Sequence, residues 1–184
     1  MPEFNSLVEL EIPRLRRYAR ALTRANHRAD DLVQTTLLRA ITKADLWQPG
    51  TDMRAWLFTI MHNQYVNSVR SGMREGQIVD IDQMASSLAA TTDPTSSCQL
   101  FELERALARL PEEQREVILL VGLEGLSYES AAEILSVPIG TVRSRLSRGR
   151  ERLRELMSMD EGRNKGKRES GAAAMPNLPQ AEAA

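Results

Sequence analysis

The sequence predicts an all-α protein with two small helical domains joined by a flexible linker. Aromatic residues make up only 4% of the 184 residues and apolar residues 42%, and the dominance of Leu and Ala favours helices. Apolar residues recur at helical spacing in two blocks, and the stretch between them is rich in Ser, Thr, Ala, Asp and Gly. We expect a first domain at 1–74, a linker at 75–98, a second domain at 99–159 and a disordered tail at 160–184.

The first block should contain three long helices. Pro13 suits a helix start, so the residues before it are expected to form a separate short helix. The helix after it carries Leu15, Tyr18 and Leu22 on one face. A second helix is expected at 28–44, with inward-facing Leu32, Leu37, Leu38 and Ile41. After a loop at 48–52, a third helix at 53–70 should bury Trp56, Leu57, Ile60 and Val66.

The second block begins with an apolar stripe and continues through several helix boundary signals. The stripe is formed by Leu100, Leu103, Leu107 and Leu110. Pro111 can start the next helix, which should end near Glu124 and Gly125. Ser127 is a good N-cap for a short helix that runs to residue 135, and Pro138 opens the last helix.

The segment 126–153 has the parts of a helix-turn-helix: a short helix, a tight turn and a longer basic helix. On the last helix, one apolar face is formed by Val142, Leu146, Gly149 and Leu153. The polar side carries the residues that we expect to contact DNA, namely Thr141, Arg143, Ser144, Ser147, Arg148 and Arg150. Arginine can donate two parallel hydrogen bonds to guanine in the major groove. The alternative is an ordinary helical hairpin with a charged exterior.

Composition excludes several classes of protein. The single cysteine, Cys98, cannot form an internal disulfide, and with two distant histidines it cannot complete a structural zinc site. No signal-peptide pattern and no apolar run of about 18 residues is present, so we expect a cytoplasmic protein without stable membrane insertion. Neither a catalytic triad nor a glycine-rich phosphate loop is apparent, so we expect no enzyme, cofactor or metal.

Both blocks resemble the extracytoplasmic-function (ECF) group of the bacterial sigma-70 family, the sigma factors that direct RNA polymerase to promoters. The string LARLPEEQREVILLVGLEGLSYESAAEILSVPIGTVRSRLSRGRERL, which starts at Leu107, is similar to sigma region 4. In the first block, ADDLVQ at 29–34 with LLRA at 37–40 is similar to region 2.2. RAWLFTI at 54–60, followed by Asn63 and Asn67, is similar to regions 2.3 and 2.4. The resemblance covers residues 14–156.

This resemblance implies three interfaces. Region 2.2 would dock on core RNA polymerase through Asp31, Gln34, Leu38 and Arg39. The melted −10 element would meet Gln48, Asp52, Met53, Arg54, Trp56, Asn63, Asn67 and Arg70. The helix-turn-helix would recognise the duplex −35 element. The alternative interpretation is that Leu38 and Trp56 have a purely structural role and pack in the core. The resemblance also implies a role in stress-responsive transcription and a cognate anti-sigma factor that buries surfaces of both blocks.

Two other functions remain open at this point. A conventional helix-turn-helix repressor or activator would explain the segment 126–153 but not the first block. A sigma-like decoy that sequesters an anti-sigma factor would explain both blocks. The intact arginine-rich helix argues against the decoy, as does the lack of an attached signal-receiver domain.

Overall fold

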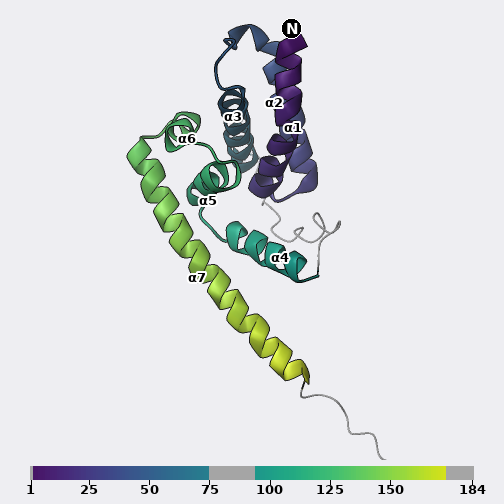
Figure 1. Cartoon of the computed structure of the whole chain (residues 1–184), viewed down its shortest axis with the longest axis vertical. Coiled ribbons are helices and arrows are strands. Elements are labelled where there is room, and N and C mark those ends of the chain that lie inside the picture. The colour runs from purple at the N-terminus through teal and green to yellow at the C-terminus, as the bar shows by residue number, and fades with distance from the viewer. Residues whose placement is uncertain (1, 75–93, 173–184) are drawn as a thin grey trace, which may run out of the picture.

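The computed structural model describes residues 2–74 and 94–172, and over these ranges its secondary structure consists of helices without strands, as the sequence predicts (Figure 1). The first block holds three long helices, α1 (Pro2–Thr23), α2 (Asn26–Thr42) and α3 (Met53–Arg74). A 3₁₀ turn, η1 (Ala44–Leu46), follows α2. Helix α2 packs on both α1 and α3, so the three helices share one core.

The helix break expected at Pro13 is absent from α1. The helix runs through this proline without interruption, although an interior proline costs about 3 kcal/mol because it lacks an N–H donor and crowds the preceding turn. Pro13 is exposed, and Phe4 and Val8 on one side of it are buried in the same cluster as Leu15 on the other. Continuous burial along one face therefore outweighs the local cost.

Two residues of α2 that were expected to face inwards are exposed instead. Its buried residues are Ala29, Leu32, Val33, Thr36 and Ala40. Leu38 and Ile41 are 68% and 60% exposed, because they follow the buried Thr36 and Ala40 by two and one positions, about 200° and 100° around the helix. Leu37 packs partly against the core, and Leu32 faces inwards as expected.

The second block contains α4 (Pro94–Ala108), α5 (Glu112–Ile118), η2 (Leu119–Leu123), α6 (Tyr128–Leu135) and α7 (Ile139–Ala172). Segment η2 is a π-helical turn that the sequence did not predict. Figure 1 shows α7 as a long rod with α6, α5 and α4 placed in turn along it. The helix α4 begins inside the range expected for the linker, whose residues 75–93 lie outside the described residues.

Two expectations for this block need correction. Leu100 is 42% exposed and does not belong to the expected apolar stripe. It precedes the fully buried Ala106 by six positions, so it lies about 120° away around the helix. Helix α7 continues to Ala172, where a disordered tail was expected from residue 160. Residues 160–172 combine Arg, Lys and Glu, which are good helix formers, with three glycines, which are poor ones, so composition does not explain this extension. The rest of the expected tail lies outside the described residues.

The two blocks share one hydrophobic core. Helix α3 packs against α6, and α1 packs against η2. One buried cluster accordingly includes Tyr18 and Phe58 from the first block together with Leu120 and Ile134 from the second. A smaller cluster of Ala106, Leu110 and Leu156 joins α4 to α7.

Candidate nucleic-acid interface

The turn between α6 and α7 has the geometry of a helix-turn-helix. Ser127 caps α6, since its hydroxyl oxygen accepts a hydrogen bond from the Ser130 amide at 3.0 Å. Ser136 ends α6 in the left-handed conformation, with φ of 52°, and α7 begins directly after Pro138. The N-cap and the turn expected from the sequence are therefore confirmed.

The inner face of α7 lies very close to α5. Val142 and Leu146 are buried on this face. Gly149 lies where the two helices approach each other, since a Cβ atom there would meet Ile118 Cδ1 at 2.8 Å and Gln114 Cβ at 3.2 Å. Glycine at this position therefore allows α5 and α7 to approach more closely than a larger residue would.

The outer face of α7 presents the residues predicted to contact DNA. Arg143, Ser147 and Arg150 are exposed, and Thr141 at the start of the helix is half-buried. The Ser144 hydroxyl donates to the Thr141 carbonyl at 3.0 Å. Arg148 donates from Nε to the Ser144 carbonyl and from Nη2 to the Ser144 hydroxyl, both at 3.3 Å. These weak bonds hold the guanidinium along the helix face and leave it accessible.

Not every arginine of α7 faces outwards. The Arg145 side chain is only 20% exposed, and its Nη2 lies 2.8 Å from the Glu113 carboxylate of α5. Arg152 pairs with Glu155 on the same helix at 2.8 Å. The first pair joins two helices of the block, so the basic composition of α7 overstates the number of cations directed at DNA.

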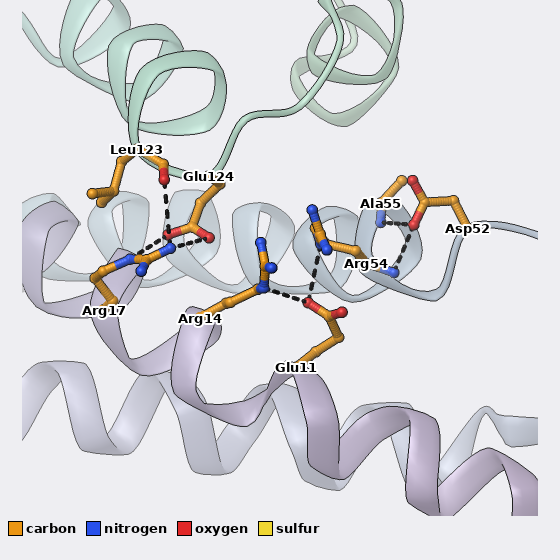
Figure 2. Close-up of polar contacts among 8 residues, drawn as sticks. All are labelled: Glu11, Arg14, Arg17, Asp52, Arg54, Ala55, Leu123 and Glu124. Atoms are coloured by element: carbon orange, nitrogen blue, oxygen red, sulfur yellow. Dashed lines mark hydrogen bonds and ion pairs between the residues drawn. The ribbon is translucent and has the colours of Figure 1, made fainter.

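The loop before α3 is ordered by hydrogen bonds among its own residues and the first residues of the helix. The Asp52 carboxylate accepts hydrogen bonds from the amides of Arg54 at 2.9 Å and Ala55 at 3.2 Å (Figure 2), which caps α3. The Gln48 carbonyl accepts bonds from the amide and the hydroxyl of Thr51. Both Gln48 and Asp52 are exposed, so the loop is ordered and open to solvent.

The other residues predicted to meet the −10 element divide into two groups. Met53 is buried, Arg54 donates to the Glu11 carboxylate at 3.1 Å (Figure 2), and Trp56 packs edge-on against Phe4 with ring centroids 6.0 Å apart. These three therefore contact the protein itself. The outward group consists of Asn63, Asn67 and Arg70, which are all exposed on α3.

The residues predicted to dock on polymerase form an exposed strip on α2. Asp31, Gln34, Leu38 and Arg39 all face solvent. The exposed Ile41 and Leu46 extend this strip towards η1. The sequence analysis assigned Ile41 to the core and made no prediction for Leu46. Leu38 and Ile41 are three residues apart and therefore lie on the same side of α2.

Polar contacts between the two blocks were not predicted at all. Arg17 of α1 donates to the Glu124 carboxylate from Nε at 3.0 Å and from Nη2 at 2.9 Å (Figure 2). Burial, followed by a hydrogen bond with Glu112, raises the pKa of Tyr65 well above its usual value. No sequence signal joins residues so far apart without a set of homologous sequences.

The described part of the chain lacks two other kinds of feature. Within the described residues, no group of His, Cys, Asp and Glu side chains is arranged to hold a metal ion. Among the same residues, no helix has the length and apolar character needed to cross a membrane.

Both blocks match known protein families. Residues 8–62 match the Sigma2 domain of PhyR, and residues 100–153 match Sigma-70, region 4. The chain is 42% identical over 149 residues to the ECF RNA polymerase sigma factor EcfG of Rhodopseudomonas palustris, covering 81% of this chain and 82% of the relative. It is 35% identical over 171 residues to the ECF sigma factor SigE of Mycolicibacterium smegmatis, covering 86% and 63%.

Solved structures give a concordant result. The sigma factor RpoE of Bartonella quintana, in complex with the anti-sigma factor NepR, is 36% identical with a TM-score of 0.75, covering 87% of this chain and 99% of that one. CnrH, in complex with the cytosolic domain of CnrY, is 27% identical with a TM-score of 0.62, covering 85% and 88%. From the matches of both blocks and from its identity with a curated relative over most of both lengths, the chain belongs to the ECF group of RNA polymerase sigma factors.

Proposed function

We propose that this chain binds core RNA polymerase in the cytoplasm and directs initiation at promoters with −10 and −35 elements, without catalysing a reaction itself. The observation that carries the proposal is the outer face of α7. Arg143, Arg148 and Arg150 are exposed on the second helix of a helix-turn-helix, in a chain 42% identical to an ECF sigma factor.

In this proposal, α7 recognises the −35 element in duplex DNA. Arg148 would meet a guanine edge in the major groove, because its guanidinium lies near the N-terminal half of the helix, where base contacts are usual. Arg150 lies further along and would neutralise phosphate, which positions the helix without specifying sequence. Ser144 supports Arg148 through the two bonds described above.

The first block would engage polymerase and the melted −10 strand with different helices. The exposed strip on α2 (Asp31, Gln34, Leu38 and Arg39) would dock on the polymerase. The amides of Asn63 and Asn67 would hydrogen-bond to unpaired bases, and Arg70 would neutralise phosphate. Met53, Arg54 and Trp56 would act indirectly by holding the loop and the start of α3 in place.

An anti-sigma factor is proposed as the regulator. Two of the similar solved structures are complexes, one with the anti-sigma factor NepR and one with the cytosolic domain of CnrY. The exposed apolar residues of α2 and α4, including Leu38 and Phe101, would suit such a protein partner.

The decoy is the second candidate, and one observation favours it. Residues 8–62 match the Sigma2 domain of PhyR, and a solved structure names PhyR as an anti-anti-sigma factor. A decoy needs only the surface that binds the anti-sigma factor. The exposed arginines of α7 would then have no function.

Run-off transcription with purified bacterial core polymerase distinguishes these functions. The assay would compare a library of candidate promoters with and without this chain, and with the variant Arg148→Ala. The proposal expects transcripts from defined start sites only when the wild-type chain is present, with fewer from the variant. Specific binding of the chain alone to duplex DNA, without initiation or polymerase binding, would favour a conventional regulator. Tight anti-sigma binding without either activity would favour the decoy.

A further inference from the structure

We propose that the N-terminal half of α1 positions the loop that reads the −10 element, through Phe4 and Glu11, and that neither residue contacts DNA itself. We call residues 48–52 the reading loop. This inference rests on the proposed function, because the orientation of the loop matters for promoter choice only if the chain reads a melted −10 strand. It assigns a role in promoter recognition to a helix that carries none of the DNA-contacting residues.

The Phe4 ring contacts the tryptophans on both sides of the reading loop. Phe4 is 5% exposed. Its ring centroid lies 5.7 Å from that of Trp47, which directly precedes the loop, and 6.0 Å from that of Trp56 in the first turn of α3. The ring planes are inclined at 58° and 74°, and tilted or edge-on arrangements are favourable for aromatic pairs. One side chain of α1 therefore supports both ends of the loop.

Trp47 is held in place by packing. Its side chain is half-buried against the main core cluster, and its Nε1 is buried without a hydrogen-bond partner among the described residues. A buried indole N–H usually has such a partner. Because no directional bond fixes the ring, its position depends on the surfaces that it touches, and Phe4 supplies one of them.

Glu11 acts on the same loop through Arg54. The Glu11 carboxylate accepts a hydrogen bond from Arg54 Nε at 3.1 Å and lies 3.7 Å from Arg14 Nε (Figure 2). The side chains of Glu11 and Arg54 are only 15% and 29% exposed, so water screens this pair less than a pair on the open surface. The backbone amide of Arg54 donates to the Asp52 carboxylate at 2.9 Å. Arg54 therefore links α1 to the last residue of the reading loop.

The reading loop depends on these supports for its orientation. Within the described residues, its hydrogen bonds stay inside the loop or reach only the first turn of α3. The amide and the hydroxyl of Thr51 donate to the Gln48 carbonyl at 3.1 and 2.7 Å. A Cβ at Gly50, where φ is 88°, would meet no atom within 4 Å. These bonds set the internal shape of the loop, whereas its attachment to the rest of the block comes from the tryptophans and Arg54.

Weakening these supports should lower the affinity for the −10 strand without altering any residue that meets it. A loop that is already in its binding conformation does not have to be ordered on binding. If only a fraction of the molecules holds that conformation, the affinity falls by the same fraction. One aromatic pair contributes a factor of about 2 to 12 to such an equilibrium. Phe4→Leu removes two pairs but keeps an apolar side chain, so we expect a loss of roughly threefold or more.

Promoter discrimination by the polymerase that carries this chain tests the inference. Run-off transcription would use the preferred promoter, a template altered in its −10 element and a template altered in its −35 element. The test variants are Phe4→Leu and Glu11→Gln. The matched control is Val8→Ala, because Val8 is also on α1 and is 6% exposed. Thermal unfolding followed by circular dichroism would measure the stability of each variant.

Both test variants should lower the preference for the intact −10 element and keep the preference for the intact −35 element. We expect a decrease of roughly threefold or more for Phe4→Leu. Val8→Ala should lower Tm and leave both preferences unchanged. An unchanged −10 preference in the folded test variants would overturn the inference. An equal loss at both elements, or the same loss in Val8→Ala, would indicate a general effect of stability and would also overturn it. If Phe4→Leu does not fold, Glu11→Gln provides the test.

Tryptophan fluorescence of the free chain gives a second measurement. The two tryptophans of the sequence are Trp47 and Trp56, so quenching by acrylamide reports the environment of the reading loop directly. Quenching should increase in Phe4→Leu and stay at the wild-type level in Val8→Ala, and equal quenching in all three proteins would refute the support by Phe4. The proposed function fails separately, if the wild-type chain yields no promoter-dependent transcripts. Transcripts whose −10 preference is the same in every variant would refute the positioning role alone.

Discussion

Replacing Gly149 by alanine tests the close packing of α5 and α7. The new Cβ would lie 2.8 Å from Ile118 Cδ1 and 3.2 Å from Gln114 Cβ. The end of the isoleucine side chain can rotate, but the glutamine Cβ is fixed by the backbone. Overpacking of this kind costs about 1–3 kcal/mol, whereas alanine gains about 1 kcal/mol over glycine in a helix interior. We expect a net loss of about 1 kcal/mol.

Thermal unfolding followed by circular dichroism measures this loss. For a chain of this size, about 1 kcal/mol corresponds to a decrease of about 2–4 °C in Tm. Gly140, also on α7, is the matched control, because a Cβ there meets no atom within 4 Å. Gly140→Ala should leave Tm unchanged or raise it, through helix propensity alone. If Gly149→Ala raised Tm as much as the control, the close approach of α5 and α7 would be refuted.

Three further predictions concern separate surfaces. Arg148→Ala should weaken binding to the preferred −35 duplex by about 5- to 150-fold. Arg152→Ala should weaken this binding by much less, because the Arg152 side chain pairs with Glu155. A fluorescence anisotropy titration measures both affinities, and equal losses would contradict the assigned roles. Leu38→Ala should reduce affinity for core polymerase while changing the free energy of unfolding by less than about 0.5 kcal/mol. Leu57 is fully buried, so Leu57→Ala should lower the free energy of unfolding by about 2–5 kcal/mol. A polymerase pull-down measures the affinity, and urea unfolding measures the stability. Because burial raises the pKa of Tyr65 in the folded state, the neutral phenol is favoured by folding, so stability should fall as pH rises above about 10. Tyr65→Phe should reduce this alkaline loss in urea midpoints measured from pH 8 to 11, and an unchanged slope would contradict it.

Local patterns predicted the helix-turn-helix well. Ser127 as a cap, the turn at residue 136 and the inner face of Val142 and Leu146 depend on residues near one another in sequence. Helical periodicity and cap chemistry are determined locally, so a single sequence is sufficient to identify them. The positions of Asn63 and Asn67 on an exposed face of α3 follow from the same periodicity.

Long-range packing explains most of what the sequence did not reveal. Leu38 and Ile41 are apolar, as core residues are, but they lie on the solvent side of α2. Hydrophobicity alone does not distinguish a core face from a docking face. Pro13 is a helix-start signal whose local preference is overridden by burial on both sides of it. The Arg17 and Glu124 pair joins residues 107 positions apart, a contact that periodicity cannot detect.

The core that crosses from one block to the other has a consequence for how the chain unfolds. Tyr18 and Phe58 share one cluster with Leu120 and Ile134, so neither block can melt without exposing apolar surface on the other. Calorimetry of the free chain should therefore show one cooperative transition rather than two independent ones. Amide hydrogens of α3 and α6 should exchange with solvent at similar rates, because both depend on the same buried surface. The two blocks thus behave as a single folding unit while the sigma factor is free.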